Sequence, residues 1–377
     1  MADALKHLID PALVRRMARH LQRAWPSFDR RRFERLGLDG LEALAMKARA
    51  MQLADALEAT LPADFDAAAE VIEAALAPPW PDDQLGGGDP GRDGLEGWAL
   101  WAVGEFVARR GLSRPKRALA TLHALTQRFS AEFAIRPFIE AQPQLTLATL
   151  QRWTADPSSH VRRLCSEGSR PRLPWGRHLG ALIDDPSPTL PILQALLDDP
   201  SPYVRRSVAN HLNDIGKDHP ARLADWVEAR LHGATAQRRQ LLAHACRSLV
   251  KQGDARVLAA FGHGARYRGT AELRLGRTRV RLGELLPWTL TLHSTAKRRQ
   301  KLLIDYAVHH VKADGARRPK IFKGWQLELA PGETRVLAKR HPFREISTRR
   351  YHAGQHALDL RVNGRVLAQA EFDLSLD

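Results

Sequence analysis

Cysteine is scarce in this chain, which has only Cys165 and Cys246 among 377 residues. Two thiols cannot build a framework of several disulfides, and they cannot supply the ligands of a cysteine-rich zinc finger. Low cysteine content is typical of proteins kept in a reducing compartment. We therefore expect a cytoplasmic protein without structural disulfides or zinc fingers.

Long hydrophobic runs are also missing. No apolar stretch approaches the ~20 residues that a helix needs to cross a bilayer. The first ten residues lack the basic and then apolar layout of a signal peptide. We expect a soluble protein that has no membrane partner.

Acidic residues are outnumbered, with 42 Asp and Glu against 58 Lys and Arg and a net charge of +16. The excess is uneven: the net charge is −5 over residues 1–100, +9 over 101–265 and +12 over 266–377. Such a distribution favours a polyanionic partner, because neutralising phosphates releases condensed counterions. Solubility in an arginine-rich proteome is the alternative reading.

One motif occurs twice in the middle of the chain. DPSSHVRR begins at Asp156 and DPSPYVRR begins at Asp199, so the copies lie 43 residues apart and share six of eight positions. A period of about 40 to 47 residues is typical of HEAT or armadillo helical pairs. Each copy predicts a turn that starts a helix, with Ser158 or Ser201 as the N-cap and a paired arginine on the exposed side.

Residues 1–265 otherwise read as amphipathic helices rich in Ala, Leu and Glu. The clear break is 78–94, which contains three consecutive glycines. No strand precedes this run and no Lys-Ser/Thr follows it, so we predict a surface loop and not a phosphate-binding loop.

From residue 266 the pattern changes to short alternating strands. Asn363-Gly364 lies between two of them and predicts a tight hairpin. Seven or eight such strands indicate an immunoglobulin-like sandwich, and Tyr351 has the position of a tyrosine corner. The predicted fold is thus an all-α HEAT-like solenoid over 1–265, including loop 78–94, followed by an all-β sandwich over 266–377.

Three phrases in the helical part carry a family resemblance: FSAEFAIRPF from Phe129, CSEGSRPRLPWG from Cys165 and NHLNDIGKDHP from Asn210. Together with the sandwich they resemble the bacterial AlkC group of DNA alkylation-repair glycosylases. The resemblance covers essentially the whole chain, and the Arg-Pro-Arg-Leu-Pro-Trp phrase is its most specific part.

This resemblance implies a monofunctional DNA glycosylase that needs no cofactor and no metal. Such enzymes hydrolyse the N-glycosidic bond of cationic bases such as 3-methyladenine and 3-methylcytosine in bent duplex DNA, without flipping the base. Matched position by position, the site residues are Glu132, Glu167, Asp214 and Trp175. The implied partner is double-stranded DNA containing alkylated bases, and we expect a monomer associated with the nucleoid.

The chemistry accords with these residue types. Loss of a cationic base needs no acid, but it builds positive charge on the deoxyribose, which carboxylates stabilise while one of them orients and deprotonates water. An indole face attracts the same charge. The alternatives are ordinary: Glu132 with Arg136, Arg163 with Glu167 and Asp214 with Lys217 have helical ion-pair spacing, and Trp175 would serve equally well in a core.

Basic residues near these positions and in the sandwich are candidate DNA contacts. Arg162 and Arg205, or their neighbours, can instead pair with Asp156 and Asp199, and the sandwich residues can be solvated loop charges. His352 and His356 are four apart in a strand, a spacing that does not indicate a metal site. The candidates are Arg162, Arg163, Arg170, Arg172, Arg177, Arg205, Arg206, Lys297, Arg298, Arg299, Arg349 and Arg350.

Two other functions stay open at this point. A catalytically inactive HEAT-repeat protein that reads DNA structure would bind DNA with strong salt dependence and release no base. A protein-interaction solenoid would show little DNA affinity, which the +12 charge of the last 112 residues disfavours.

Overall fold

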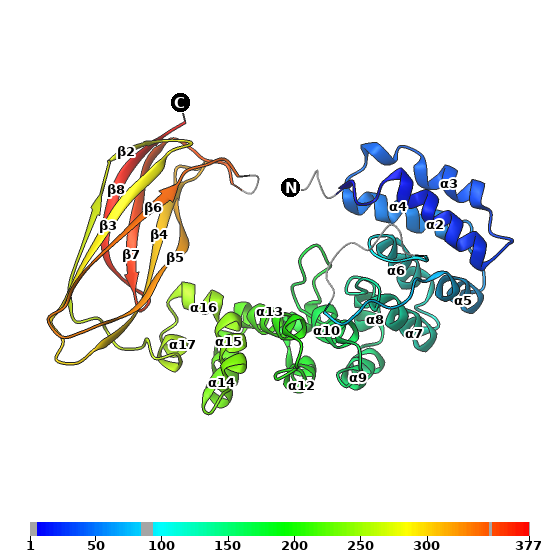
Figure 1. The fold of residues 1–377 in the computed structure, drawn as a ribbon, viewed down its shortest axis with the longest axis horizontal. Helices are drawn as coiled ribbons and strands as arrows, with labels where there is room; N and C mark the ends of the chain where they lie inside the picture. The colour runs from blue at the N-terminus through cyan, green and yellow to red at the C-terminus, as the bar shows by residue number, and fades with distance from the viewer. Residues whose placement is uncertain (1–5, 84–92, 347–348, 377) are drawn as a thin grey trace. The chain divides into compact units, whose positions relative to one another are not determined.

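The computed structural model describes residues 6–83, 93–346 and 349–376. The chain divides into two compact units. The first unit comprises the chain up to Asp218 together with Thr235–Ala245, and the second comprises His219–Ala234 and the chain from Cys246. The predicted fold class is confirmed: helices are followed by a β-sandwich (Figure 1).

The first unit is a stack of short helices in which successive elements lie side by side (Figure 1). Helix α10 packs on α13, and α13 packs on α15. The elements are α2 (Pro11–Ala24), α3 (Arg30–Leu38), η1 (Leu41–Ala43), α4 (Met46–Glu58), α5 (Phe65–Ala75), α6 (Ala99–Arg110), α7 (Pro115–Thr126), α8 (Arg136–Ala141), α9 (Pro143–Trp153), α10 (Ser159–Gly168), α11 (Gly180–Asp184), η2 (Ser187–Thr189), α12 (Leu190–Ala195), α13 (Pro202–Asp218) and α15 (Ala236–Ala245).

The two copies of the repeated motif open α10 and α13, as predicted, but their N-caps differ. In the second copy the hydroxyl of Ser201 accepts hydrogen bonds from the amides of Tyr203 and Val204, each at 3.2 Å. In the first copy the side chain of Ser158 makes no such bond. The prediction is therefore confirmed for Ser201 and wrong for Ser158.

The missing cap of α10 is supplied by the segment 78–83, which we call the strap. Asp82 accepts a hydrogen bond from the amide of Ser159 at 2.8 Å, and the amide of Asp83 donates to the Ser159 hydroxyl at 2.9 Å. The Asp83 carboxylate also accepts from the hydroxyl of Ser201 at the start of α13. Residues 78–83 are thus packed across both repeats, contrary to the prediction of a plain surface loop, while 84–92 lie outside the described residues.

Within its described residues, the second unit contains the sandwich and three helices. The helices are α14 (Pro220–Leu231), α16 (Arg247–Gln252) and α17 (Ala255–Ala260). Arg256 of α17 pairs with Asp225 and Glu228 of α14, and Asn363 of the sandwich donates to the carbonyl of Ala265 at 2.9 Å. The change from helix to strand falls between Ala260 and Gly269, and a domain boundary at residue 265 stays a prediction.

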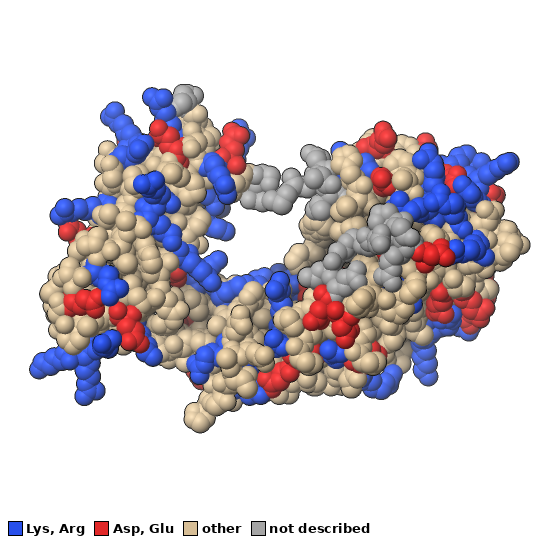
Figure 2. Space-filling model, viewed as in Figure 1, with Lys and Arg blue, Asp and Glu red and all other residues tan. Residues whose placement is uncertain are grey.

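The sandwich has one sheet of order β1-β3-β6 and a second of order β2-β8-β7-β4-β5, in which only the β2–β8 pair is parallel. On the face of the sandwich seen in Figure 2, Lys and Arg are more prominent than Asp and Glu. The strands are β1 (Gly269–Leu275), β2 (Arg279–Arg281), β3 (Leu285–Ser294), β4 (Gln300–Val311), β5 (Arg317–Leu329), β6 (Thr334–Pro342), β7 (Gly354–Val362) and β8 (Arg365–Ser375).

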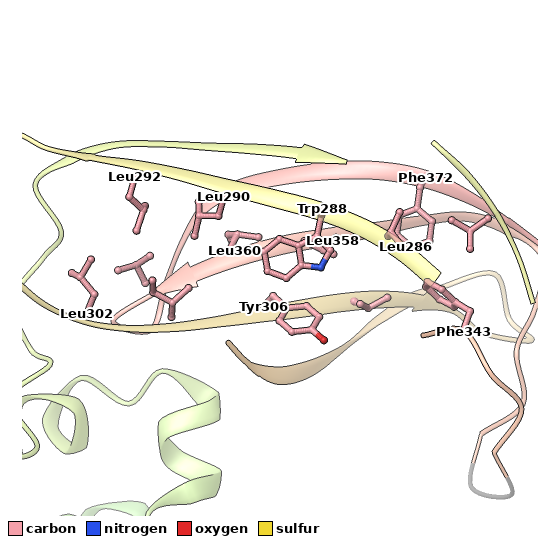
Figure 3. Packing of buried hydrophobic residues seen from close by; sticks show 14 of the residues in the cluster. Leu286, Trp288, Leu290, Leu292, Leu302, Tyr306, Phe343, Leu358, Leu360 and Phe372 are labelled. Atoms are coloured by element: carbon pink, nitrogen blue, oxygen red, sulfur yellow. The ribbon is translucent and has the colours of Figure 1, made fainter. Parts of the chain in front are cut away.

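Alternate residues of facing strands fill the sandwich core, as period-two patterning requires. Trp288 of β3 is 1% exposed and lies 5.0 Å from the ring of Tyr306 on β4, measured between centroids (Figure 3). The hairpin at Asn363-Gly364 is confirmed, since both residues have positive φ, at 48° and 78°. The tyrosine corner is not formed in its usual way: the Tyr351 hydroxyl accepts from the side chain of Arg349.

No helix within the described residues is both long and apolar enough to cross a membrane. Within the same residues no group of three or more His, Cys, Asp or Glu side chains is arranged to hold a metal ion.

Candidate active site

An aromatic hollow of about 360 Å³ lies on the first unit. Its lining combines residues from the strap, the residue that precedes α6, the turn before α8, α10, the α10–α11 connection and α13. The residues are Trp80, Trp98, Phe129, Ser130, Glu132, Phe133, Arg163, Pro174, Trp175 and Tyr203. Two of the predicted site residues, Glu132 and Trp175, therefore share one hollow, which we call the aromatic pocket.

Trp175 presents its ring to solvent although it is large and apolar. Its side chain is 58% exposed, and its ring is stacked on Trp101 with centroids 6.4 Å apart and planes 9° from parallel. Trp101 in turn stacks on Phe133. Trp175 is not a core residue, so the alternative reading from sequence is wrong, and one face of the indole is available to a ligand.

The backbone of Trp175 has φ of 65°, a conformation that residues other than glycine rarely adopt. Strain of this kind costs of order 1–3 kcal/mol and persists only where surrounding contacts hold the segment. The segment 169–177 that carries Trp175 contains turns but no helix or strand. Contacts outside the segment must therefore fix the orientation of the indole.

Glu132 lies in the turn before α8 and not in the helix, so the helical spacing considered for Glu132 and Arg136 does not apply. It consequently makes no ion pair with Arg136. Its Oε2 accepts from the Ser130 hydroxyl at 2.8 Å and from Nη1 of Arg163 at 2.7 Å. With 16% of its side chain exposed, Glu132 is the most accessible of the three predicted carboxylates.

Glu167 is the second carboxylate and lies deeper, with 7% of its side chain exposed. It pairs with Arg163 at 3.6 Å and with Arg170 at 2.6 Å, and it accepts from the Ser207 hydroxyl at 2.6 Å. Burial alone would raise the pKa of Glu167, but the two guanidinium groups and the Ser207 hydrogen bond outweigh burial and leave its pKa below the ordinary value. Glu167 is therefore ionised at neutral pH.

Asp214, the third carboxylate, has no exposed side-chain surface. It pairs with Arg170 at 2.8 Å and with Lys217 at 2.7 Å. The three acids and three bases thus form one continuous chain, which we call the charge ladder, in the order Glu132, Arg163, Glu167, Arg170, Asp214 and Lys217. The expected pairs Arg163–Glu167 and Asp214–Lys217 exist, but as parts of this ladder.

Tyr203 lines the pocket and packs against Arg163 of the charge ladder. The guanidinium of Arg163 lies over its ring at 4.9 Å from the centroid. Burial raises the pKa of the Tyr203 phenol even though the Arg163 charge opposes the shift. Arg163, which lines the pocket, is therefore held by two carboxylates and an aromatic face.

Comparisons with known proteins agree on one relationship. A family model described as "DNA alkylation repair enzyme" matches residues 128–249, and one described as the C-terminal Ig-like domain of uncharacterised protein YhaZ matches 269–376. The uncharacterized protein YhaZ of Bacillus subtilis is 35% identical over 99% of this chain and 100% of its own length. The alkylpurine DNA glycosylase AlkC of Pseudomonas fluorescens, solved bound to DNA containing an abasic site analog, aligns with a TM-score of 0.87 and 35% identity over 98% of this chain and 99% of its own. The chain belongs to the AlkC family of DNA alkylation repair proteins.

Within this AlkC homologue, the arginines at equivalent positions of the two repeats are structural. Arg162 donates to the carbonyls of Asp156 and Pro157, and Arg205 donates to those of Asp199 and Pro200. Arg162 also pairs with Asp199 at 2.7 Å. Both guanidinium groups stabilise the turn that opens their own helix, so the prediction that they contact DNA receives no support from their geometry.

Arg170 is likewise an unsuitable phosphate ligand, since it is 7% exposed and engaged in the charge ladder. Arg172 pairs with Asp218 at 2.7 Å, and Arg177 pairs with Glu140 at 2.6 Å while 59% of its side chain stays exposed. Arg206 is exposed and forms no ion pair with any residue of the described chain. Arg177 and Arg206 remain the better candidates for DNA contact on the first unit.

On the sandwich, the predicted residues Arg349 and Arg350 line a hollow of about 760 Å³. Three further cations share it: Lys312, Arg318 and Lys320. Sequence patterning did not associate these residues because they come from β5, from the turn before it and from the approach to β7. The other predicted group, Lys297, Arg298 and Arg299, is exposed between β3 and β4, with Arg299 3.9 Å from Glu328.

Proposed function

We propose that this protein is a monofunctional DNA glycosylase that hydrolyses the N-glycosidic bond of cationic alkylated bases, such as 3-methyladenine and 3-methylcytosine, in duplex DNA. The observation that carries the proposal is the presence of Glu132 and an exposed Trp175 face in one pocket. A carboxylate beside an aromatic face suits a sugar that becomes cationic as the base departs.

Glu132 has the role of orienting and deprotonating the attacking water, because it is the carboxylate that lines the pocket. Trp175 packs against the deoxyribose and attracts its developing charge. Glu167 and Asp214 are not among the residues that line the pocket. They hold the side chains of Arg163 and Arg170 in place, and their negative charges balance the positive charges of the ladder. A water nucleophile is favoured over a Schiff base because no lysine is among the residues that line the described pocket.

The exposed ring of Trp175 also supports attack on a nucleotide that stays in the DNA stack. A ring that is 58% exposed meets a ligand at the protein surface and does not enclose it in a cavity. We accordingly propose that the duplex is bent over this surface and that the damaged base is not flipped, as the family resemblance implies.

The proposal is tested by incubating the purified full-length chain with methylated duplex DNA and chromatographing the released bases. We expect release of 3-methyladenine without strand cleavage. Tight, salt-sensitive binding without base release would instead identify a protein that reads DNA structure, and would contradict the proposed activity.

A further inference from the structure

Arg136, at the start of α8, has no exposed surface, yet it carries a guanidinium group. It donates to backbone carbonyls only: to Gly168 at 2.9 Å, to Arg170 at 2.8 Å, to Pro171 at 3.5 Å and, through two of its nitrogens, to Arg177. Burial lowers the pKa of Arg136 to about 10, so the group stays charged at neutral pH. Within the described chain none of its hydrogen bonds goes to a carboxylate, so its hydrogen-bonding partners are carbonyl dipoles.

The acceptors lie at the two ends of one segment. Gly168, Arg170 and Pro171 begin the stretch that carries Trp175, and Arg177 ends it. The backbone hydrogen bonds of the segment are few: the Gly176 amide donates to the Leu173 carbonyl at 3.2 Å, and the Leu179 amide donates across the base to the Pro171 carbonyl at 3.1 Å. One buried cation, together with this one backbone hydrogen bond, therefore closes the base of the segment whose tip is Trp175.

The same cation fixes the charge ladder. Arg170 accepts from Arg136 through its carbonyl, while its guanidinium bridges Glu167 and Asp214. The direction of the Arg170 side chain and the position of Trp175 thus depend on a common support. The sequence indicates Arg136 only as a helical partner for Glu132, with which it makes no ion pair.

We propose that Arg136 is a positioning residue for the excision reaction, holding the Trp175 indole in its strained conformation against the pocket and Arg170 in the ladder. This inference rests on the proposed function. It goes beyond that function by placing control of the active geometry on a residue that does not line the pocket.

The chain offers a matched control in Arg49 of α4. Arg49 is 2% exposed and likewise donates only to backbone carbonyls, those of Lys6, Ile9, Glu42 and Leu44. It does not line the pocket. Replacing Arg49 therefore removes a comparable set of buried hydrogen bonds from the same unit, without touching the segment that carries Trp175.

The test compares Arg136→Lys with Arg49→Lys in the full-length chain. Lysine keeps the charge, but its three donors on one nitrogen cannot span both ends of the segment. Both variants are expected to lower the thermal midpoint. Only Arg136→Lys is expected to lower the single-turnover rate of base release, roughly 10²-fold as for a displaced reacting group, while the Kd for undamaged duplex stays within about twofold.

A second readout does not depend on activity. The segment contains trypsin sites after Arg172 and Arg177, and we expect Arg136→Lys to accelerate native-state cleavage at these sites while Arg49→Lys does not. Equal cleavage in the two variants, or equal single-turnover rates, would overturn the inference. If the wild-type chain released no base, the proposed function would fail, whereas the cleavage comparison would still decide whether Arg136 holds the segment.

Discussion

At the residue scale, the three predicted carboxylates differ in depth. The exposed side-chain fraction falls from 16% for Glu132 to 7% for Glu167 and 0% for Asp214. The family phrases identified all three positions but could not grade them, because burial and pairing depend on residues up to 44 positions away. In the ladder each of the three carboxylates has a basic partner.

Removing the charge of Asp214 should be costly for stability. Asp214→Asn leaves Arg170 and Lys217 short of a buried partner, and breaking a buried pair costs about 3–5 kcal/mol. Denaturant unfolding should show this loss in the full-length chain. Asp55→Asn is the control, because Asp55 also pairs with an arginine but is 69% exposed, and an exposed pair contributes at most about 1 kcal/mol. Equal losses in the two variants would contradict the assignment of Asp214 as a buried ladder residue.

At the element scale, local signals predicted much of the fold. Alternating residues predicted the strands, Asn363-Gly364 predicted its hairpin, and the repeated Asp-Pro-Ser predicted the starts of α10 and α13. The strap was not predictable in this way. Its hydrogen bonds to Ser159 and Ser201 join residues 76 to 118 positions apart, and the nearby glycines made a surface loop the natural reading. Sequence patterning therefore gave no sign that Trp80 lines the pocket.

We predict that Asp82 of the strap contributes both to stability and to base release. Asp82→Ala removes the acceptor for the Ser159 amide and should destabilise the first unit by about 0.5–2 kcal/mol, as loss of an N-cap does. Asp64→Ala, which uncaps α5 by removing the acceptor for Ala67, should cost a similar amount. Only Asp82→Ala should also slow base release, because the strap places Trp80 in the pocket. Unchanged release by a destabilised Asp82→Ala would count against a role of the strap in the site.

The sandwich should lose stability as the pH falls. Burial lowers the pKa of His310 to about 3 and that of His341 to about 4, with the nearby Arg349 charge acting in the same direction. In the unfolded chain both titrate near 6.5. Between about pH 6.5 and 4 the unfolded state therefore binds more protons, so the stability that is full above 6.5 declines as the pH is lowered.

Thermal unfolding between pH 7 and pH 4.5 measures this effect. The His310→Gln chain should show a weaker dependence of its midpoint on pH than the wild type. Identical pH dependence in the two chains would show that His310 does not contribute.

At the scale of the whole molecule, charge is the property that the sequence predicted best, since the +12 of residues 266–377 needs no knowledge of contacts. Which cations come together was not predictable. The hollow on the sandwich combines Lys312 and Lys320 of the β4–β5 hairpin with Arg350 from the approach to β7, a distant part of the chain. On the first unit, by contrast, several of the arginines predicted to contact DNA form ion pairs with carboxylates of the protein itself.

We expect the sandwich cations to contribute to DNA affinity in a salt-dependent way. Lys312→Gln, Lys320→Gln and Arg350→Gln combined in one chain should weaken binding and reduce the slope of log K against log salt by about 0.9 for each phosphate that the protein no longer neutralises. The charge-matched control combines Arg31→Gln, Arg32→Gln and Arg35→Gln on α3, in the net acidic part of the chain. Indistinguishable slopes for the two triple variants would exclude the sandwich hollow as a DNA-binding surface.

The most direct measurement is the single-turnover rate of 3-methyladenine release from duplex DNA under saturating protein, for the wild type and Glu132→Gln. Loss of a general base predicts a rate lower by about 10²–10⁴-fold with DNA affinity retained. Glu73→Gln, which disrupts the Glu73–Arg117 pair outside the pocket, should leave the rate near that of the wild type. A Glu132→Gln rate equal to that of the wild type would contradict the central claim that this carboxylate performs the chemistry.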